Sequence, residues 1–145
     1  MCMSRMISVV FMALIILSPS FKHKLPKNGL IVQTGGVVST WTAYVVDFDS
    51  GTIRFYKADW NKDPEMRKLA GSRKLDPKII SDIRALADQA IAANYVSPEG
   101  SDVDFSESLE VSKHGKITVT NTFGPVVDEK QPISSLLNLL SEQFH

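Results

Sequence analysis

The stretch Asp76–Asn94, DPKIISDIRALADQAIAAN, is the clearest helix signal in the sequence, and it lies between two groups of strand-like segments. Asp76 is a good N-cap because its carboxylate can accept hydrogen bonds from first-turn N–H groups, and Pro77 suits the first helical position. Asn94 tolerates the left-handed conformation that ends many helices. One apolar stripe at three- and four-residue spacing comprises Ile79, Ile83, Leu86, Ala87 and Ala90. The stripe predicts a helix that packs in the core, against a sheet.

Strand-like segments precede this helix. The apolar run Leu30–Gln33 is bounded by glycines and predicts a first strand. The segment Thr40–Lys57 alternates apolar and polar residues on both sides of a turn, which predicts a β-hairpin. A three-residue loop, Asp49-Ser50-Gly51, pairs Tyr44 with Tyr56 and gives Gly51 a left-handed conformation. We therefore expect that register.

A second hairpin is predicted at Leu109–Asn121, after the helix. Apolar residues alternate with polar ones in both of its strands. A three-residue loop, Lys113-His114-Gly115, pairs Val111 with Ile117 and again supplies a left-handed glycine. The same register test argues against a two-residue turn here.

The remaining segments complete the order of elements. Ala58–Lys74 is polar and is interpreted as a long connection with a helical turn at Pro64–Leu69. Ser97–Ser108 is an acidic loop, and Pro132–Phe144 carries a second apolar helical stripe. The order β-β-β-α-β-β-α predicts a two-layer α+β fold, in which an antiparallel sheet of about five strands has two helices packed on one face.

The N-terminal residues have the layout of a secretory signal. A basic residue precedes the apolar run Met6–Leu17, and small residues follow at Ser18-Pro19-Ser20. We expect cleavage after residues 1–20, because the run is short for a bilayer span. The alternative is an uncleaved N-terminal anchor. Cleavage would leave a flexible lead-in at 21–28 and a single α+β domain at 29–145. We expect this mature chain in the periplasm of a bacterium or secreted from it, without stable membrane insertion.

Composition excludes several classes of function. The 16 basic and 16 acidic residues give no net charge, so nothing points to nucleic acid or an anionic membrane. The one cysteine, Cys2, precedes the apolar run, so neither a disulfide nor a lipid-attachment site is expected in the mature chain.

No motif predicts a catalytic site, a metal site or a cofactor. A calcium loop requires glycine at its sixth position and glutamate at its twelfth. Counted from Asp102, those positions hold Glu107 and Lys113. The three histidines lack metal-ligand spacing, and Gly35-Gly36 leads into a strand and not into a phosphate-binding helix.

The predicted outer face of the first hairpin is the candidate partner-binding surface. Its residues are Tyr44, Val46, Arg54 and Tyr56, with Trp60 shortly after the strand. Tyrosine, tryptophan and arginine are enriched where protein interfaces concentrate binding energy. The alternative is that Tyr44 and Tyr56 are an ordinary cross-strand pair.

The order of elements resembles the emfourin-like protease inhibitors. The shared features are an early strand ending in Gly-Gly (Gln33-Thr34-Gly35-Gly36), a helix, an acidic loop, a hairpin and a terminal leucine-rich segment. The chain departs from that family by its hairpin at Thr40–Lys57 and its signal sequence. The resemblance implies an inhibitor, and no inhibitory residues carry over.

These observations predict a small exported, non-catalytic module that binds another protein, as an inhibitor or an immunity-type partner. Two alternatives remain open. The first is a hydrolase-like enzyme with a loop-built site, drawn from Asp102, Asp104, Glu107 or His114. The second is an accessory subunit of an envelope complex, in which case its apolar surface would join a larger assembly.

Overall fold

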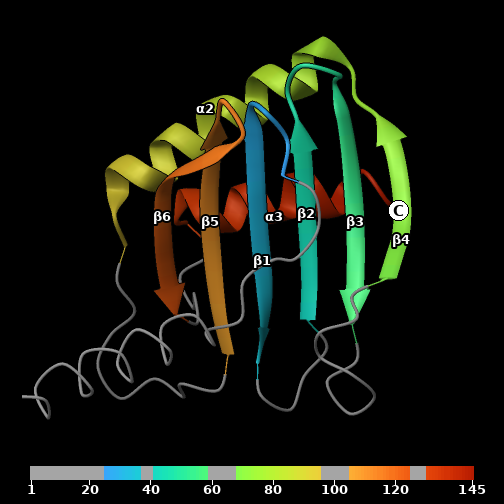
Figure 1. The fold of residues 1–145 in the computed structure, drawn as a ribbon. Coiled ribbons are helices and arrows are strands. Elements are labelled where there is room, and N and C mark those ends of the chain that lie inside the picture. Colours follow the sequence, from blue (N-terminus) through green and yellow to red (C-terminus); the bar gives the residue numbers. More distant parts are fainter. Residues whose placement is uncertain (1–24, 37–40, 59–67, 96–104, 125–129) are drawn as a thin grey trace, which may run out of the picture.

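The computed structural model describes residues 25–36, 41–58, 68–95, 105–124 and 130–145. One antiparallel sheet of six strands runs in the order β4-β3-β2-β1-β5-β6, and two helices lie against the same face of it (Figure 1). The elements are β1 (Gly29–Gly36), β2 (Trp41–Asp47), β3 (Thr52–Ala58), β4 (Lys68–Lys74), α2 (Pro77–Ala93), β5 (Phe105–Lys113), β6 (Lys116–Gly124) and α3 (Pro132–Glu142). The predicted two-layer α+β class is confirmed, with one strand more than the five expected.

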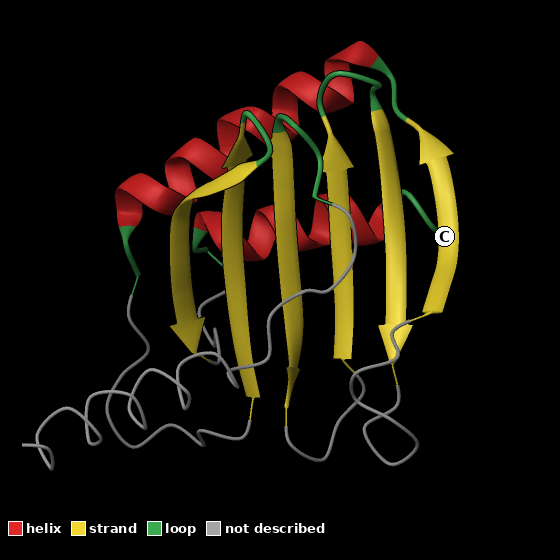
Figure 2. Ribbon diagram, viewed as in Figure 1, coloured by secondary structure: helices red, strands yellow, loops and turns green. Residues whose placement is uncertain are grey.

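The chain path explains why both helices cover one face. Strands β1 to β4 form a meander, and β1 also pairs with β5 near the middle of the sheet. Helix α2 leads from the β4 edge back to β5, and α3 returns from the β6 side toward β4 (Figure 2). The C-terminus therefore lies beside β4 (Figure 1).

Helix α2 begins and ends where its sequence predicts. The Asp76 carboxylate accepts a hydrogen bond from the Lys78 N–H at 3.0 Å, and Pro77 is the first helical residue. Asn94 ends the helix with φ 45°. The centre of the predicted stripe is buried, at Ile83, Ala87 and Ala90. None of the described helices combines the length and apolar character needed to cross a lipid bilayer.

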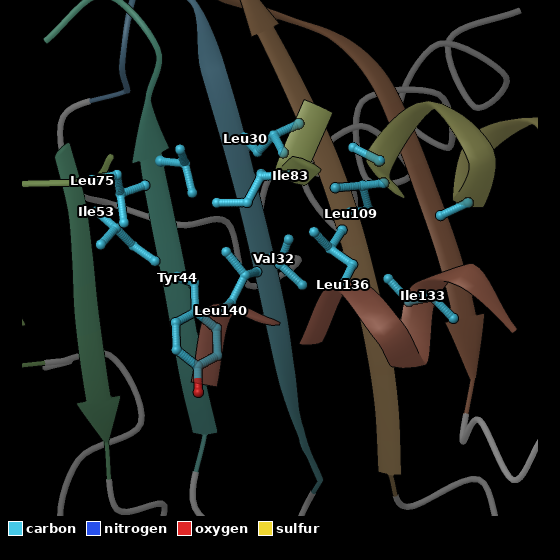
Figure 3. Packing of buried hydrophobic residues seen from close by; sticks show 13 residues of the cluster. Leu30, Val32, Tyr44, Ile53, Leu75, Ile83, Leu109, Ile133, Leu136 and Leu140 are labelled. Carbon is cyan, nitrogen blue, oxygen red and sulfur yellow. The ribbon is translucent and has the colours of Figure 1, made fainter. Parts of the chain in front are cut away.

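The main core lies between the helices and the sheet. Figure 3 shows its side chains converging from β1, β2, β3, β5, α2 and α3. We call this side of the sheet the helix face and the opposite side the far face. The buried residues of this core are Leu30, Val32, Tyr44, Val46, Ile53, Leu75, Ile83, Ala87, Ala90, Leu109, Ile133, Leu136 and Leu140.

Strand β4 replaces part of the predicted connection at 58–74. The strand pairs antiparallel with β3, and the register shifts between Phe55 and Tyr56. Six of its seven residues are exposed, so it lacks the buried alternation by which strands are recognised. The expected helical turn at Pro64–Leu69 is wrong at Lys68 and Leu69, which lie in the strand, and its other positions lie outside the described residues.

The first hairpin closes through a four-residue loop, Phe48–Gly51, one residue longer than predicted. The Asp47 carboxylate stabilises the wider loop by accepting hydrogen bonds from the N–H groups of Asp49 and Ser50, at 3.0 and 3.3 Å. Gly51 has the predicted left-handed conformation, with φ 69°.

The second hairpin closes through two residues, and the prediction of a three-residue loop is wrong. His114 and Gly115 have φ values of 54° and 77°, as a type I′ turn requires. A register shift after Val111 absorbs one residue, so that Val111 pairs with Val119 and not with Ile117. This bulge keeps apolar residues on a shared face without the longer loop.

Candidate functional site

Two of the predicted binding residues, Tyr44 and Val46, lie in the core. Tyr44 pairs with Phe55 across the hairpin, and the two rings stack with their centroids 5.0 Å apart. Tyr44 is 8% exposed and Val46 is fully buried. The predicted pairing of Tyr44 with Tyr56 is therefore wrong, and a partner in solution would not reach Tyr44 or Val46.

The Tyr44 hydroxyl makes a side-chain hydrogen bond with Ser141 of α3. Burial raises the pKa of Tyr44 above its ordinary value, and the hydrogen bond with Ser141 partly offsets that rise. The Tyr44 side chain therefore links the C-terminal end of α3 to the sheet. Its role is structural.

The other two described residues of the predicted surface, Arg54 and Tyr56, lie together on the far face. Directly paired residues share a face, and Arg54 pairs with Val45 while Tyr56 pairs with Ala43. The Arg54 guanidinium carbon lies 6.0 Å from the centroid of the Tyr56 ring, the outer limit of a cation–π contact.

Tyr56 belongs to a second, smaller apolar cluster on the far face. It is 4% exposed and is clustered with Ile31, Ala43 and Val45. Leu25 and Ile117 pack against the cluster. The ring of Tyr56 thus packs near the Arg54 guanidinium, and little of its surface is accessible to a binding partner.

Leu69 of β4 adds an exposed apolar side chain next to this pair. It is directly opposite Tyr56 in the β3–β4 ladder, and so lies on the far face. Its side chain is 55% exposed, and it is the one exposed large hydrophobic residue among those whose side chains the structure describes. We call Arg54, Tyr56 and Leu69 the β3–β4 corner.

Positive charge is concentrated on the same two strands. Strands β3 and β4 contain no acidic residue and five basic ones, Arg54, Lys57, Lys68, Arg73 and Lys74, although the whole chain has no net charge. Lys57 and Lys68 are directly opposite each other and both exposed, a like-charge pair that is unfavourable on its own. We call these five residues the basic strip.

Sequence reasoning missed Leu69 and most of the strip because β4 was not recognised. The available signal was three basic residues and no acid within Lys68–Lys74. Trp60 lies outside the described residues, so its place in the surface stays a prediction.

The residues considered for an enzymatic site are not brought together in the described part of the chain. Asp102 and Asp104 lie outside the described residues, Glu107 belongs to β5, and His114 is an exposed turn residue. The described residues contain no group of three His, Cys, Asp or Glu side chains that could hold a metal ion.

An open groove of about 520 Å³ is lined by residues of α2 and α3. Its lining mixes two carboxylates with amides and apolar side chains: Asp82, Ala85, Leu86, Gln89, Ser135, Asn138, Leu139 and Glu142. No buried polar atom points to a ligand there, so the β3–β4 corner is the stronger candidate within the described residues.

No protein-family model and no curated protein matches this chain. The candidate site therefore rests on geometry and charge alone.

Proposed function

We propose that this chain is a small exported, non-catalytic module that binds another protein through the β3–β4 corner. The observation that carries the proposal is the exposure of Leu69 on the far face, where it is opposite Tyr56 and on the same side of the sheet as Arg54. Neither of the described helices lies on that face. Arginine is enriched at the energetic centres of protein interfaces, and burial of the exposed Leu69 side chain against a partner would add a hydrophobic contribution.

The order of elements, which resembles the emfourin-like protease inhibitors, supports an inhibitor or immunity-type role within this proposal. The predicted signal sequence supports a partner in the periplasm or outside the cell.

The test is comparative affinity capture from a periplasmic extract. The baits are the wild-type chain, Arg54→Ala/Leu69→Ser, and the control variant Thr118→Ala/Thr120→Ala, which alters exposed residues of the opposite edge strand β6. We expect one or more proteins to be recovered by wild type and control and lost by the corner variant. Equal recovery by all three baits would refute the corner as the binding surface.

A further inference from the structure

Strand β4 is an edge of the sheet, and its outward backbone groups can be assigned. The Leu75 N–H donates to the Gly51 carbonyl at 2.7 Å, directly after the strand. Antiparallel pairs alternate between hydrogen-bonded and non-hydrogen-bonded. Arg73 and Gly71 therefore bond toward β3, while the N–H and C=O groups of Ser72 and Lys74 point away from the sheet.

The charge of this edge favours an acidic occupant. The basic strip places five cations and no acid on β3 and β4, whereas the opposite edge strand, β6, carries one cation, Lys116. Acidic side chains added beside β4 would relieve the repulsion between Lys57 and Lys68.

A second copy of the chain is a poor occupant for the same reason. Antiparallel pairing of two β4 strands would bring together the three cations of each copy with no acid to offset them. In a register centred on Gly71, Lys68 of each copy would lie directly opposite Lys74 of the other. Lysines also protect many sheet edges from any pairing. A purely protective edge would bind no added strand of either charge.

We propose that β4 accepts an extended acidic segment of a partner protein as an additional antiparallel strand. The backbone of Ser72 and Lys74 supplies the hydrogen bonds, the basic strip selects acidic residues, and Leu69 offers an apolar contact on the far face. This mode of binding rests on the proposed function, because it specifies how the β3–β4 corner recognises its partner.

The experiment uses the full mature chain and fluorescent peptides of alternating glutamate and valine, glutamine and valine, or lysine and valine. In fluorescence anisotropy we expect the glutamate peptide to bind ~10-fold or more tightly than the other two. Raising the salt concentration should weaken that binding, because the contacts are exposed ion pairs. Equal affinity for all three peptides, or no binding, would overturn the proposal.

Ser72→Pro is the matched variant, because proline removes an outward N–H and is tolerated on edge strands, whereas Ser72→Thr keeps that group. We expect Ser72→Pro to lose ~10-fold or more in affinity and Ser72→Thr to bind as wild type. Thermal unfolding confirms that each variant is folded. Independently of any variant, hydrogen exchange in wild type should slow at the amides of Ser72 and Lys74 when the glutamate peptide binds.

The outcomes separate this inference from the proposed function. Capture of a partner that depends on Arg54 and Leu69 but survives Ser72→Pro would overturn strand addition and leave the binding module intact. Binding of the glutamate peptide that leaves hydrogen exchange at the Ser72 and Lys74 amides unchanged would have the same meaning. Capture that is insensitive to the corner variant would refute the proposed function itself.

Discussion

The ring of Phe144 occupies the space in which a side chain at position 71 would lie. A Cβ atom built on Gly71 would come within 2.8 Å of Phe144 Cε1. Phe144 also packs on Phe55, with ring centroids 5.3 Å apart, and Arg73 donates a hydrogen bond to the Gln143 carbonyl at 2.6 Å. The end of the chain after α3 thus packs on the helix face of β3 and β4 and leaves the outer edge of β4 open.

Gly71→Val should therefore destabilise the fold by about 1–3 kcal/mol, because the added side chain displaces the Phe144 ring. Chemical denaturation measures the change in the free energy of unfolding. The double variant Gly71→Val/Phe144→Ala should be less destabilised than the sum of the single variants, since removal of the ring makes room. Strict additivity would show that the two positions do not compete for space.

Ile83→Ser should cost about 2–5 kcal/mol, because it empties part of the core beneath the sheet and buries a hydroxyl group. Ala85→Ser, on the exposed side of the same helix, is the control and should change stability by less than about 1 kcal/mol. The folded fraction of Ile83→Ser should capture partners as wild type does. Loss of capture in fully folded protein would instead place α2 in the binding surface.

The parts of the fold that depend on local signals could be predicted from the sequence. Asp76, Pro77 and Asn94 fix the bounds of α2, and the apolar periods of both helices identify the face that they bury. Local signals failed where hydrogen bonds or irregular pairing decide the register. The Asp47 carboxylate lengthens the first turn by one residue, which reverses the face expected for Tyr44 and Val46.

Strand β4 was missed for a different physical reason. An edge strand that is exposed on both sides has no apolar alternation, and its pairing is set by β3 and not by its own composition. Only part of the candidate site could accordingly be predicted from the sequence. Arg54 and Tyr56 share the far face, whereas Leu69 and the cations of β4 become visible only when that strand is in place.

Tyr44 should make stability depend on pH in the alkaline range. Burial raises the pKa of Tyr44 above that of the unfolded chain, which is about 10. The unfolded state therefore releases its proton first, so this contribution is fully present below pH ~10 and is lost as pH rises above that value through the folded pKa. Tyr44→Phe removes the ionisable group, and the stability gap between wild type and variant should narrow or reverse above pH ~10. A gap that stays constant from neutral to alkaline pH would contradict this assignment.

The described part of the lead-in is fastened to the sheet. The carbonyl of Lys27 accepts a hydrogen bond from Gly115 N–H at 3.0 Å, and the carbonyl of Asn28 accepts one from Phe48 N–H at 2.9 Å. Asn28 Nδ2 also donates to the Asp49 carboxylate at 3.0 Å. These contacts join both hairpin turns to the segment before β1.

We therefore expect two truncated forms of the chain, one with and one without the lead-in, to differ in stability. Protein that begins at Phe21 should unfold as the untruncated domain does. Protein that begins at Gly29 should lose on the order of 2–4 kcal/mol in its free energy of unfolding, since three hydrogen bonds contribute about 1 kcal/mol each and the burial of Leu25 adds to them.

Intact mass of the exported protein should show the loss of residues 1–20 and the retention of Leu25–Asn28. A mass that keeps Met1–Ser20 would favour an N-terminal anchor, and equal stability of both truncated forms would mean that the lead-in contacts do not hold the turns.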